Sequence, residues 1–406
     1  MSLTFDEERS PYLIQKIFPS INNNDFLEFR IPPNSKGNID LSGSLLHLVI
    51  TIPELSDKTV KLLPQNYFGL CQFSSLEIRI NGEALTHRTC ANEYYLSGYF
   101  QYITNYASEY IISALGTIGV FDNRNFTCHY LDQSKVAAPD YYKEIIEQRT
   151  TPNNSKTFEI IMPINSSIFY TNSTLPTNTA VELSFERTSA KQSTVFSKTP
   201  TTTISTIDVF TLEDAYLTVP VVKNQKMLHL EKNISKPIKI KYDEYLIHRF
   251  NVPKGNSLAR IANAITGKFP AKLFWGLMTI DAYNGTFKEC SLHLQQHNVN
   301  KCTLYVDGNP VPGYPVTMHK GISQPYMKWV ENTSKYLNPF SSTLITPREF
   351  SLYHFIYSAQ LDPDASGSMT FEFEFKTALN KDLVLIVCAA HERTMQLDQF
   401  RKFKLI

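Results

Sequence analysis

Short segments in which apolar and polar residues alternate run along most of the chain. In the first half they are "FLEFRIPP" (26–33), "LLHLVITIP" (45–53), "SSLEIRING" (74–82), "TFEIIMPI" (157–164), "AVELSFERT" (180–188) and "FTLEDAYLTVPVV" (210–222). Period-two alternation turns one face of a strand to a core and the other to water. Because Asn, Gly, Pro and Ser clusters rather than helices separate these segments, the pattern predicts antiparallel β-sandwiches.

The second half continues in kind, and it contains the longest apolar runs of the chain. "LFWGLMTI" (273–280) and "LVLIVCAA" (383–390) have eight residues each. A membrane-spanning helix needs about 20 apolar residues, so both runs predict buried strands instead. We expect no membrane-spanning segment.

Two segments of the first half have helical spacing. "NEYYLSGYFQYITNYASEYIISAL" (92–115) and "PDYYKEIIEQRT" (139–150) carry apolar and aromatic residues three and four apart. This spacing predicts helices laid on a sheet or carried in a long loop.

Two hairpins are predicted by the same turn chemistry. Asn81–Gly82 follows one strand and Asp307–Gly308 follows another, "TLYV" (303–306). A two-residue turn that matches strand twist needs positive φ at its centre, which Asn-Gly and Asp-Gly supply. These residues are structural and confer no chemistry. After the second turn, Pro310 and Pro312 cannot donate to a ladder, so we expect the returning strand at an edge.

The hairpins belong to a longer correspondence between the halves. In chain order, "FRIPPNSKG" matches "FNVPKG", "LLHLVITI" matches "LFWGLMTI", the hairpins match, "LSFERT" matches "FEFKTA", and "DVFTLEDAYL" matches "DLVLIVCAA". The offset falls from 226 at Gly82 and Gly308 to 174 at Asp208 and Asp382, so the first copy carries about fifty extra residues. The predicted helices lie where this insertion must be. The order predicts a doubled fold.

Composition fits two folded domains and excludes some functions. The 406 residues exceed one ordinary core, and 42% hydrophobic with 19% charged residues provides material for large cores. A net charge of +1 argues against a chain whose main work is neutralising phosphates. Acids near the N-terminus argue against a secretory signal. The six scattered cysteines predict buried thiols in a reducing compartment rather than disulfides.

Candidate chemistry is sparse. His293 and His297 have the spacing of a helical zinc pair but lack the following Glu, so we expect a buried or surface pair without metal. No phosphate-binding loop, dinucleotide fingerprint or nucleophile elbow is present in the sequence. Glu213 with Asp214, and Glu372 with Glu374, have the spacing of candidate paired catalytic carboxylates. Glu372 and Glu374 alternate with phenylalanines, which predicts the solvent-exposed face of a half-buried strand instead. We therefore expect no catalytic residue, no metal and no cofactor.

One stretch of the second half resembles a known family. "RFNVPKGNSLARIANAITGKFPAKLFWGLMTIDAYNGTFKE" and "HNVNKCTLYVDGNPVPGYPV" are similar to the major capsid proteins of Polinton (Maverick) elements and adintoviruses. The matching positions are 253–256, 269–272, 281–286 with the turn residues Asn284 and Gly285, and 304–308. "NYFGLCQFSSLEIRINGEALTH" and "TLEDAYLTVPVV" of the first half also look like this family, whereas "FKECSLHLQQH" departs from it.

The resemblance implies an all-β fold of two tandem eight-stranded jelly-rolls, with the small helices in loops. It implies an arm over 1–20, one jelly-roll with the helical insertion over 21–224, and a second jelly-roll with the C-terminal tail over 225–406. In such viruses a homotrimer forms a pseudohexagonal capsomer of an icosahedral shell, assembled inside the host cell. The expected partners are neighbouring capsomers, penton and minor capsid proteins, and weakly the packaged double-stranded DNA.

Two other functional classes remain open at this point. A glycan-binding or adhesive tandem β-sandwich would expose Trp or Tyr at loop ends, and this chain has only Trp275 and Trp329. An enzyme of the His or Cys type would bind zinc or hold a reactive thiol near His293 and His297.

Overall fold

The strands of the first half form two facing sheets in the computed structural model. The structure describes residues 12–33, 37–56, 60–86, 92–105, 116–119, 157–171, 174–196, 208–222, 238–318, 321–333, 345–398 and 402–405. They are β1 (Tyr12–Ile17), β2 (Ile21–Asn22), β3 (Phe26–Ile31), β4 (Asn38–Asp40), β5 (Leu45–Thr51), β6 (Leu62–Pro64), β7 (Phe73–Ile80), β8 (Glu83–Ala84), β9 (Thr157–Pro163), β10 (Thr174–Leu175), β11 (Val181–Arg187), β12 (Thr194–Phe196) and β13 (Thr211–Val222). One sheet has the order β10-β4-β13-β5-β9 with β1 beside β13, and the other has β2-β3-β11-β7-β8. A separate pair joins β12 to β6.

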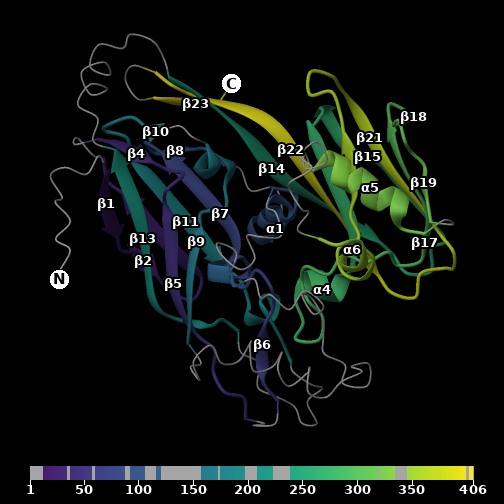
Figure 1. The fold of residues 1–406 in the computed structure, drawn as a ribbon, viewed down its shortest axis with the longest axis horizontal. Coiled ribbons are helices and arrows are strands. Elements are labelled where there is room, and N and C mark those ends of the chain that lie inside the picture. Colours follow the sequence, from purple (N-terminus) through teal and green to yellow (C-terminus); the bar gives the residue numbers. More distant parts are fainter. Residues whose placement is uncertain are drawn as a thin grey trace.

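The second half repeats this arrangement beside the first (Figure 1). Its strands are β14 (Ile238–Val252), β15 (Leu258–Lys268), β16 (Lys272–Thr279), β17 (Val299–Val306), β18 (Asn309–Pro310), β19 (Val316–Thr317), β20 (Tyr357–Gln360), β21 (Ser366–Phe375), β22 (Leu383–Leu397) and β23 (Phe403–Leu405). One sheet has the order β14-β22-β16-β20 with β23 beside β22. The other has β15-β21-β17-β18 with β19 beside β17.

The two halves have the same topology. The principal strands are β1, β3, β5, β7, β8, β9, β11 and β13 in the first half, and β14 to β18 with β20, β21 and β22 in the second. Numbered from one to eight within each half, these strands form one sheet in the order 1-8-3-6, which is β1-β13-β5-β9 and β14-β22-β16-β20. The other sheet has the order 2-7-4-5, which is β3-β11-β7-β8 and β15-β21-β17-β18. This is the antiparallel order of a jelly-roll, so the predicted doubling of the fold is confirmed.

One of the five predicted sequence pairs is wrong. "FRIPPNSKG" begins in the last residues of β3, the second principal strand of its half, whereas "FNVPKG" begins in the last residues of β14, the first principal strand of the other half. Both segments leave a sheet through a Pro-containing loop, and this local likeness does not fix the position of a strand in a sheet. The other four pairs join strands in equivalent positions, namely β5 with β16, the hairpins β7–β8 with β17–β18, β11 with β21, and β13 with β22.

Helices occur in both halves, which corrects the expectation that they are confined to the first. The helix predicted over 92–115 is α1 (Glu93–Asn105) in the part that the structure describes, and the helix predicted over 139–150 lies outside the described residues. The second half contains α4 (Ile280–Asn284), α5 (Ser323–Asn332) and α6 (Pro347–Leu352). Helix α1 and the pair α5 and α6 precede β9 and β20, which are the sixth principal strands of their halves.

The core follows the alternation read from the sequence. In β5, Leu46, Leu48 and Ile50 are fully buried and the residues between them are half-buried. Strands β16 and β22 instead contain unbroken runs of buried residues over 273–279 and 383–390. Both faces of β16 are covered, because Trp275 packs on Phe371 of β21 and Phe274 packs on Phe100 of helix α1 in the first half.

The longest ribbon of the molecule reaches from the second half to the first. Strands β14 and β22 pair over their full 15 residues, from Ile238 opposite Leu397 to Val252 opposite Leu383. Figure 1 shows this ribbon crossing above α1, with β23 at the far end beside the first half. Residues 391–397, where the expected C-terminal tail would begin, therefore belong to β22, and β23 pairs with them.

Candidate functional site: the junction and the predicted site residues

A buried polar network joins the two halves. Gln65, next to β6, donates a hydrogen bond from Nε2 to Ser291 Oγ (2.8 Å) and accepts one at Oε1 from the Ser291 backbone N–H (3.2 Å). The Ser291 hydroxyl in turn donates to the Gln192 carbonyl (2.6 Å). Because all three residues are buried, each bond satisfies a group that water cannot reach.

The same junction continues through Tyr283, at the end of α4. Its carbonyl accepts hydrogen bonds from the Gln192 side chain (3.0 Å) and from the Asn92 side chain (3.1 Å), and both donors belong to the first half. One acceptor thus anchors two segments of the other half.

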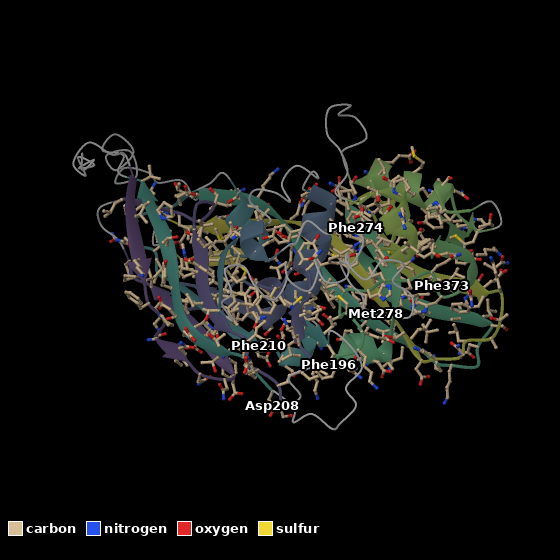
Figure 2. The ribbon with its side chains drawn as sticks, turned by 60° about the horizontal axis from the view of Figure 1, so that its bottom comes forward. Phe196, Asp208, Phe210, Phe274, Met278 and Phe373 are labelled. Atoms are coloured by element: carbon tan, nitrogen blue, oxygen red, sulfur yellow. The ribbon has the colours of Figure 1, made fainter. Side chains whose placement is uncertain are left out.

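Aromatic rings complete the junction. Phe196 of β12 lies 4.7 Å from Phe287 between ring centroids, and its N–H donates to the Phe287 carbonyl (2.8 Å). Phe100 of α1 stacks on Phe274 of β16 at 6.4 Å. In Figure 2, Phe274 lies near the centre of the molecule beside α1, whereas Phe210 and Phe373 fill the interiors on either side.

A histidine of the second half pairs with a tyrosine of the first across this junction. Tyr99 Oη of α1 and His354 Nδ1 share a hydrogen bond of 2.5 Å. Burial, together with the smaller effect of the nearby His293, lowers the pKa of His354 to about 3. The ring is therefore neutral at physiological pH and acts as a structural partner of Tyr99.

The predicted histidine pair lies close to this contact. His293 is 7% exposed. Its Nε2–H donates to the Leu352 carbonyl (3.2 Å), and the Gln295 side chain donates to Nδ1 (3.0 Å). Burial lowers the pKa of both His293 and His297 to about 4. Within the described ranges no three His, Cys, Asp or Glu side chains are grouped so as to hold a metal ion.

The structure places the predicted turn residues at three chain reversals. Asn81 and Gly82 join β7 to β8, and Asp307 and Gly308 join β17 to β18, all with positive φ between 48° and 85°. Gly285, with φ 81°, caps the C-terminus of α4, so Asn284 ends a helix rather than a strand. Strand β18 is the edge of its sheet, as expected from Pro310.

The candidate catalytic carboxylates lie on the solvent-exposed faces of strands. Glu374 pairs with Lys301 at 2.5 Å, and Glu372 accepts a hydrogen bond from the Tyr305 hydroxyl (3.2 Å). Glu213 accepts a hydrogen bond from the Thr51 hydroxyl at the end of β13. Each acid thus has a local structural partner.

Cysteines and tryptophans of the described residues are core groups. Cys71, Cys290, Cys302 and Cys388 are free thiols with no exposed surface, and Cys90 and Cys128 lie outside the described residues. Trp275 and Trp329 are 0% exposed. Trp275 packs against Tyr314, Tyr357 and Phe371, so it cannot offer a face to a sugar. No helix among the described residues has the length and apolarity that crossing a bilayer requires.

Sequence reasoning missed the junction, although one signal pointed to it. An unbroken apolar run indicates a strand that is covered on both faces, and β16, which consists of one such run, contacts α1 through Phe274 and Phe100. The polar partners Gln65, Gln192 and Ser291 carry no comparable local pattern. They meet only because the fold brings segments 99 and 226 residues apart together.

Comparison with known proteins agrees with this architecture. No family model matches the chain. An uncharacterised protein of Caenorhabditis elegans, F54H12.2, is 26% identical over 135 residues, which are 32% of this chain and 32% of that protein. The match thus spans well under two thirds of the relative.

Solved structures match over nearly the whole chain. The chain is similar to a protein in the cryo-EM structure of the Sputnik virophage (TM-score 0.65, 11% identity, 97% of this chain and 88% of that one). It is also similar to the mavirus major capsid protein (TM-score 0.57, 11% identity, 97% and 90%) and to the Faustovirus major capsid protein (TM-score 0.54, 9% identity, 97% and 92%). Since these matches run through both halves and each half has the jelly-roll strand order, the chain has the double jelly-roll fold.

Proposed function

We propose that this protein is a structural major capsid protein that forms the shell of an icosahedral DNA virus. The observation that carries the proposal is the match of 97% of the chain to the mavirus and Faustovirus major capsid proteins, with both jelly-rolls in order. A shell subunit needs rigid sandwiches rather than a reactive centre. The buried thiols, neutral buried histidines and locally paired carboxylates support a structural role rather than an enzymatic one.

We further propose that the virus belongs to the Polinton or adintovirus group, or that the gene is an endogenous copy. The motifs at 253–256, 281–286 and 304–308 support this assignment. We propose the boundary between the two jelly-rolls at 224/225, which agrees with the end of β13 at Val222 and the start of β14 at Ile238.

We propose that the N-terminal arm is shorter than the expected 1–20. Residues 12–17 form β1 and pair with β13, so this part belongs to the first sandwich. We propose that the remaining partners are neighbouring capsomers, penton and minor capsid proteins, and the packaged genome.

The test is the mass of the purified protein by light scattering, followed by negative-stain imaging. We expect a species of about 139 kDa, three times the 46.4 kDa of one chain, with a pseudohexagonal outline. A monomer that forms no particle at any salt concentration or pH contradicts the trimer and favours the adhesive β-sandwich. Glycan-array binding would then be measured.

A further inference from the structure

A narrow groove lies between the two halves of the chain, where β14 packs beside α1. Ser97 and Gln101 line it from α1, and Tyr242 and Glu244 line it from β14. Four helix residues rise about 6 Å and two strand residues rise about 7 Å, so the two pairs cover similar lengths of the groove. Its volume is about 70 Å³, which gives room for about five to seven water-sized atoms. Both walls belong to one chain, so the groove does not depend on a neighbouring copy.

Three buried polar groups on this groove have no hydrogen-bond partner among the residues that the structure describes. They are Gln101 Oε1, Asn165 Oδ1 and Tyr242 Oη, and their residues are 5%, 4% and 9% exposed. The amide nitrogens already have acceptors, because Asn165 Nδ2 donates to the Tyr94 carbonyl (3.0 Å) and Gln101 Nε2 donates to Ser167 Oγ (3.5 Å). A buried oxygen that is left unpaired is costly. The groove therefore requires a ligand that donates hydrogen bonds.

The unpaired oxygens lie at two levels of the groove. Gln101 and Tyr242 also line the larger cleft that adjoins it, so both lie at the same end. Asn165 lies further along, because its side-chain amide donates to the Ser97 hydroxyl (3.3 Å), one helical turn from Gln101. Glu244 follows Tyr242 by two residues, on the same face of β14. A donor is therefore needed at each level.

The charges of the groove favour a cation. In the described part of the chain its charged side chains are Glu93 and Glu244, and no Lys, Arg or His lines it. Arg393 binds Glu244 from outside the groove, with Nε 2.8 Å from Oε2. Burial and, to a smaller extent, Glu244 raise the pKa of Tyr242, so its hydroxyl stays neutral.

Apolar groups line the groove between its polar groups. Leu76, Leu246 and Tyr245 contribute this surface. Such walls hold methylene groups, and tyrosine rings attract cations. A metal ion would need a shell of oxygen ligands in place of these walls. A ligand with ammonium ends and a methylene body uses both kinds of surface.

We propose that the groove binds a short aliphatic diamine, with one ammonium group between Gln101 and Tyr242 and the other between Asn165 and Glu244. An ammonium group carries hydrogen-bond donors and no acceptor, which is what unpaired oxygens require. Extended diaminobutane spans about one helical turn between its nitrogens, which matches the spacing of the two levels. Because the ligand contacts both α1 and β14, it ties the first half to the second. The inference goes beyond the proposed capsid function and does not depend on it.

An anion fits the groove less well than a diamine. A larger cleft of about 710 Å³ adjoins the groove and carries charges of both signs, namely Lys241, Lys268, Lys272, Arg393, Asp243 and Glu392. None of these side chains is among the described residues that line the groove itself. The unpaired oxygens of Gln101 and Asn165 repel an anion, so we expect inorganic phosphate not to compete with a diamine.

Isothermal titration calorimetry of the full chain with diaminobutane tests the proposal. We expect one diamine per chain, no binding of the neutral butanediol, and no competition from CaCl₂ or phosphate. The diamine should also raise the melting temperature, since a ligand that binds only the folded state stabilises it. No heat with diaminobutane would mean that ordered water fills the groove, and competition by Ca²⁺ would mean a metal site. Either result overturns the proposal.

Tyr242→Phe separates binding from folding. It removes a hydroxyl that has no partner within the described residues, so the melting temperature without ligand should not fall. Diaminobutane should bind about tenfold more weakly, because one ammonium group loses an acceptor. Gln101→Met, which removes the other acceptor at this end, should weaken binding by a similar factor.

Tyr305→Phe is the matched control for Tyr242→Phe. The Tyr305 hydroxyl donates to Glu372, and Tyr305 does not line the groove, so we expect the wild-type affinity for diaminobutane. If Tyr242→Phe and Tyr305→Phe bound the diamine equally well, the groove would not be the site.

Glu244→Gln tests the position of the second ammonium group. The variant should bind diaminobutane about tenfold more weakly, but it should bind butylamine, which has a single ammonium group, as the wild type does. Glu77→Gln is the control, because Glu77 is exposed on β7 and pairs with Arg79 outside the groove. It should change neither affinity. A Glu244→Gln variant that loses affinity for both amines equally, or for neither, overturns the two-point arrangement.

Discussion

Three buried histidines link the stability of this fold to pH. His354, His293 and His297 lie near one another at or beside the junction, and each has a pKa lowered to between about 3 and about 4 by burial. In the unfolded chain a histidine has a pKa of about 6.5. The unfolded state therefore binds more protons below pH 6.5, and stability is complete above that value and decreases as pH falls toward 4.

We predict that His354→Gln flattens this dependence. Because His354 stays neutral in the folded protein, it lowers the free energy of unfolding at pH 5 by roughly 2 kcal/mol relative to pH 7. This value follows from the pKa of histidine in the unfolded chain, which lies about 1.5 units above pH 5. Denaturant unfolding at pH 7.5 and pH 5.0 should show a smaller loss for the variant than for the wild type. The carboxylates titrate alike in both proteins, so equal losses would contradict the role of His354.

A second residue-scale prediction concerns the hairpin glycine Gly308. Its φ is 80°, and a Cβ added there would meet nothing within 4 Å. The cost of Gly308→Ala is therefore conformational rather than steric, roughly 1–2 kcal/mol. Denaturant midpoints check it, with Ser366→Ala at an exposed strand end as the control, for which we expect a change within about 0.5 kcal/mol. If Gly308→Ala and Ser366→Ala had the same denaturant midpoint, the turn would not need a residue with positive φ at this position.

At the scale of elements, strands were more predictable than helices. Period-two alternation predicted β3, β5, β7, β9, β11 and β13 to within a few residues, because burial on one face imposes the pattern. Helices α5 and α6 were missed because α5 contains Pro325 and few apolar residues, and α6 has only six residues. A usable signal was nevertheless present. "TPRE" at 346–349 combines a capping Thr, Pro at the first helical position and Glu three residues on.

We predict that Thr346→Ala destabilises α6. The Thr346 hydroxyl accepts a hydrogen bond from the Glu349 N–H (3.3 Å), and the Glu349 carboxylate accepts one from the Thr346 N–H (2.7 Å). Loss of the cap should cost about 1 kcal/mol. Hydrogen exchange over 346–352 should speed up in Thr346→Ala and remain slow in Thr346→Ser, which keeps the hydroxyl. Equally fast exchange in both variants would mean that the cap does not hold the helix.

At the scale of the whole molecule, the two sandwiches form a single packed body. Their buried side chains belong to one continuous cluster that runs from Leu27 to Leu397, and the junction adds hydrogen bonds from Gln65, Asn92 and Gln192. The doubled pattern in the sequence predicted two equivalent units but not this union. Each unit has its own local alternation, whereas the contacts between them join residues far apart in the chain.

We therefore predict that the wild-type protein unfolds in one calorimetric transition and that Gln65→Ala separates it into two. The substitution leaves the Ser291 N–H without its acceptor and removes a donor from Ser291 Oγ, at a cost of about 1–3 kcal/mol for each buried group left unpaired. Two of the lost bonds cross the junction to Ser291, and a third joins Gln65 to the Gln192 carbonyl within the first half, so the first half should melt at a lower temperature than the second. Gln360→Ala, at an exposed position at the end of β20, should keep a single transition. If Gln65→Ala lowered the temperature of one undivided transition, apolar packing of α1 on β16 would be sufficient to couple the halves.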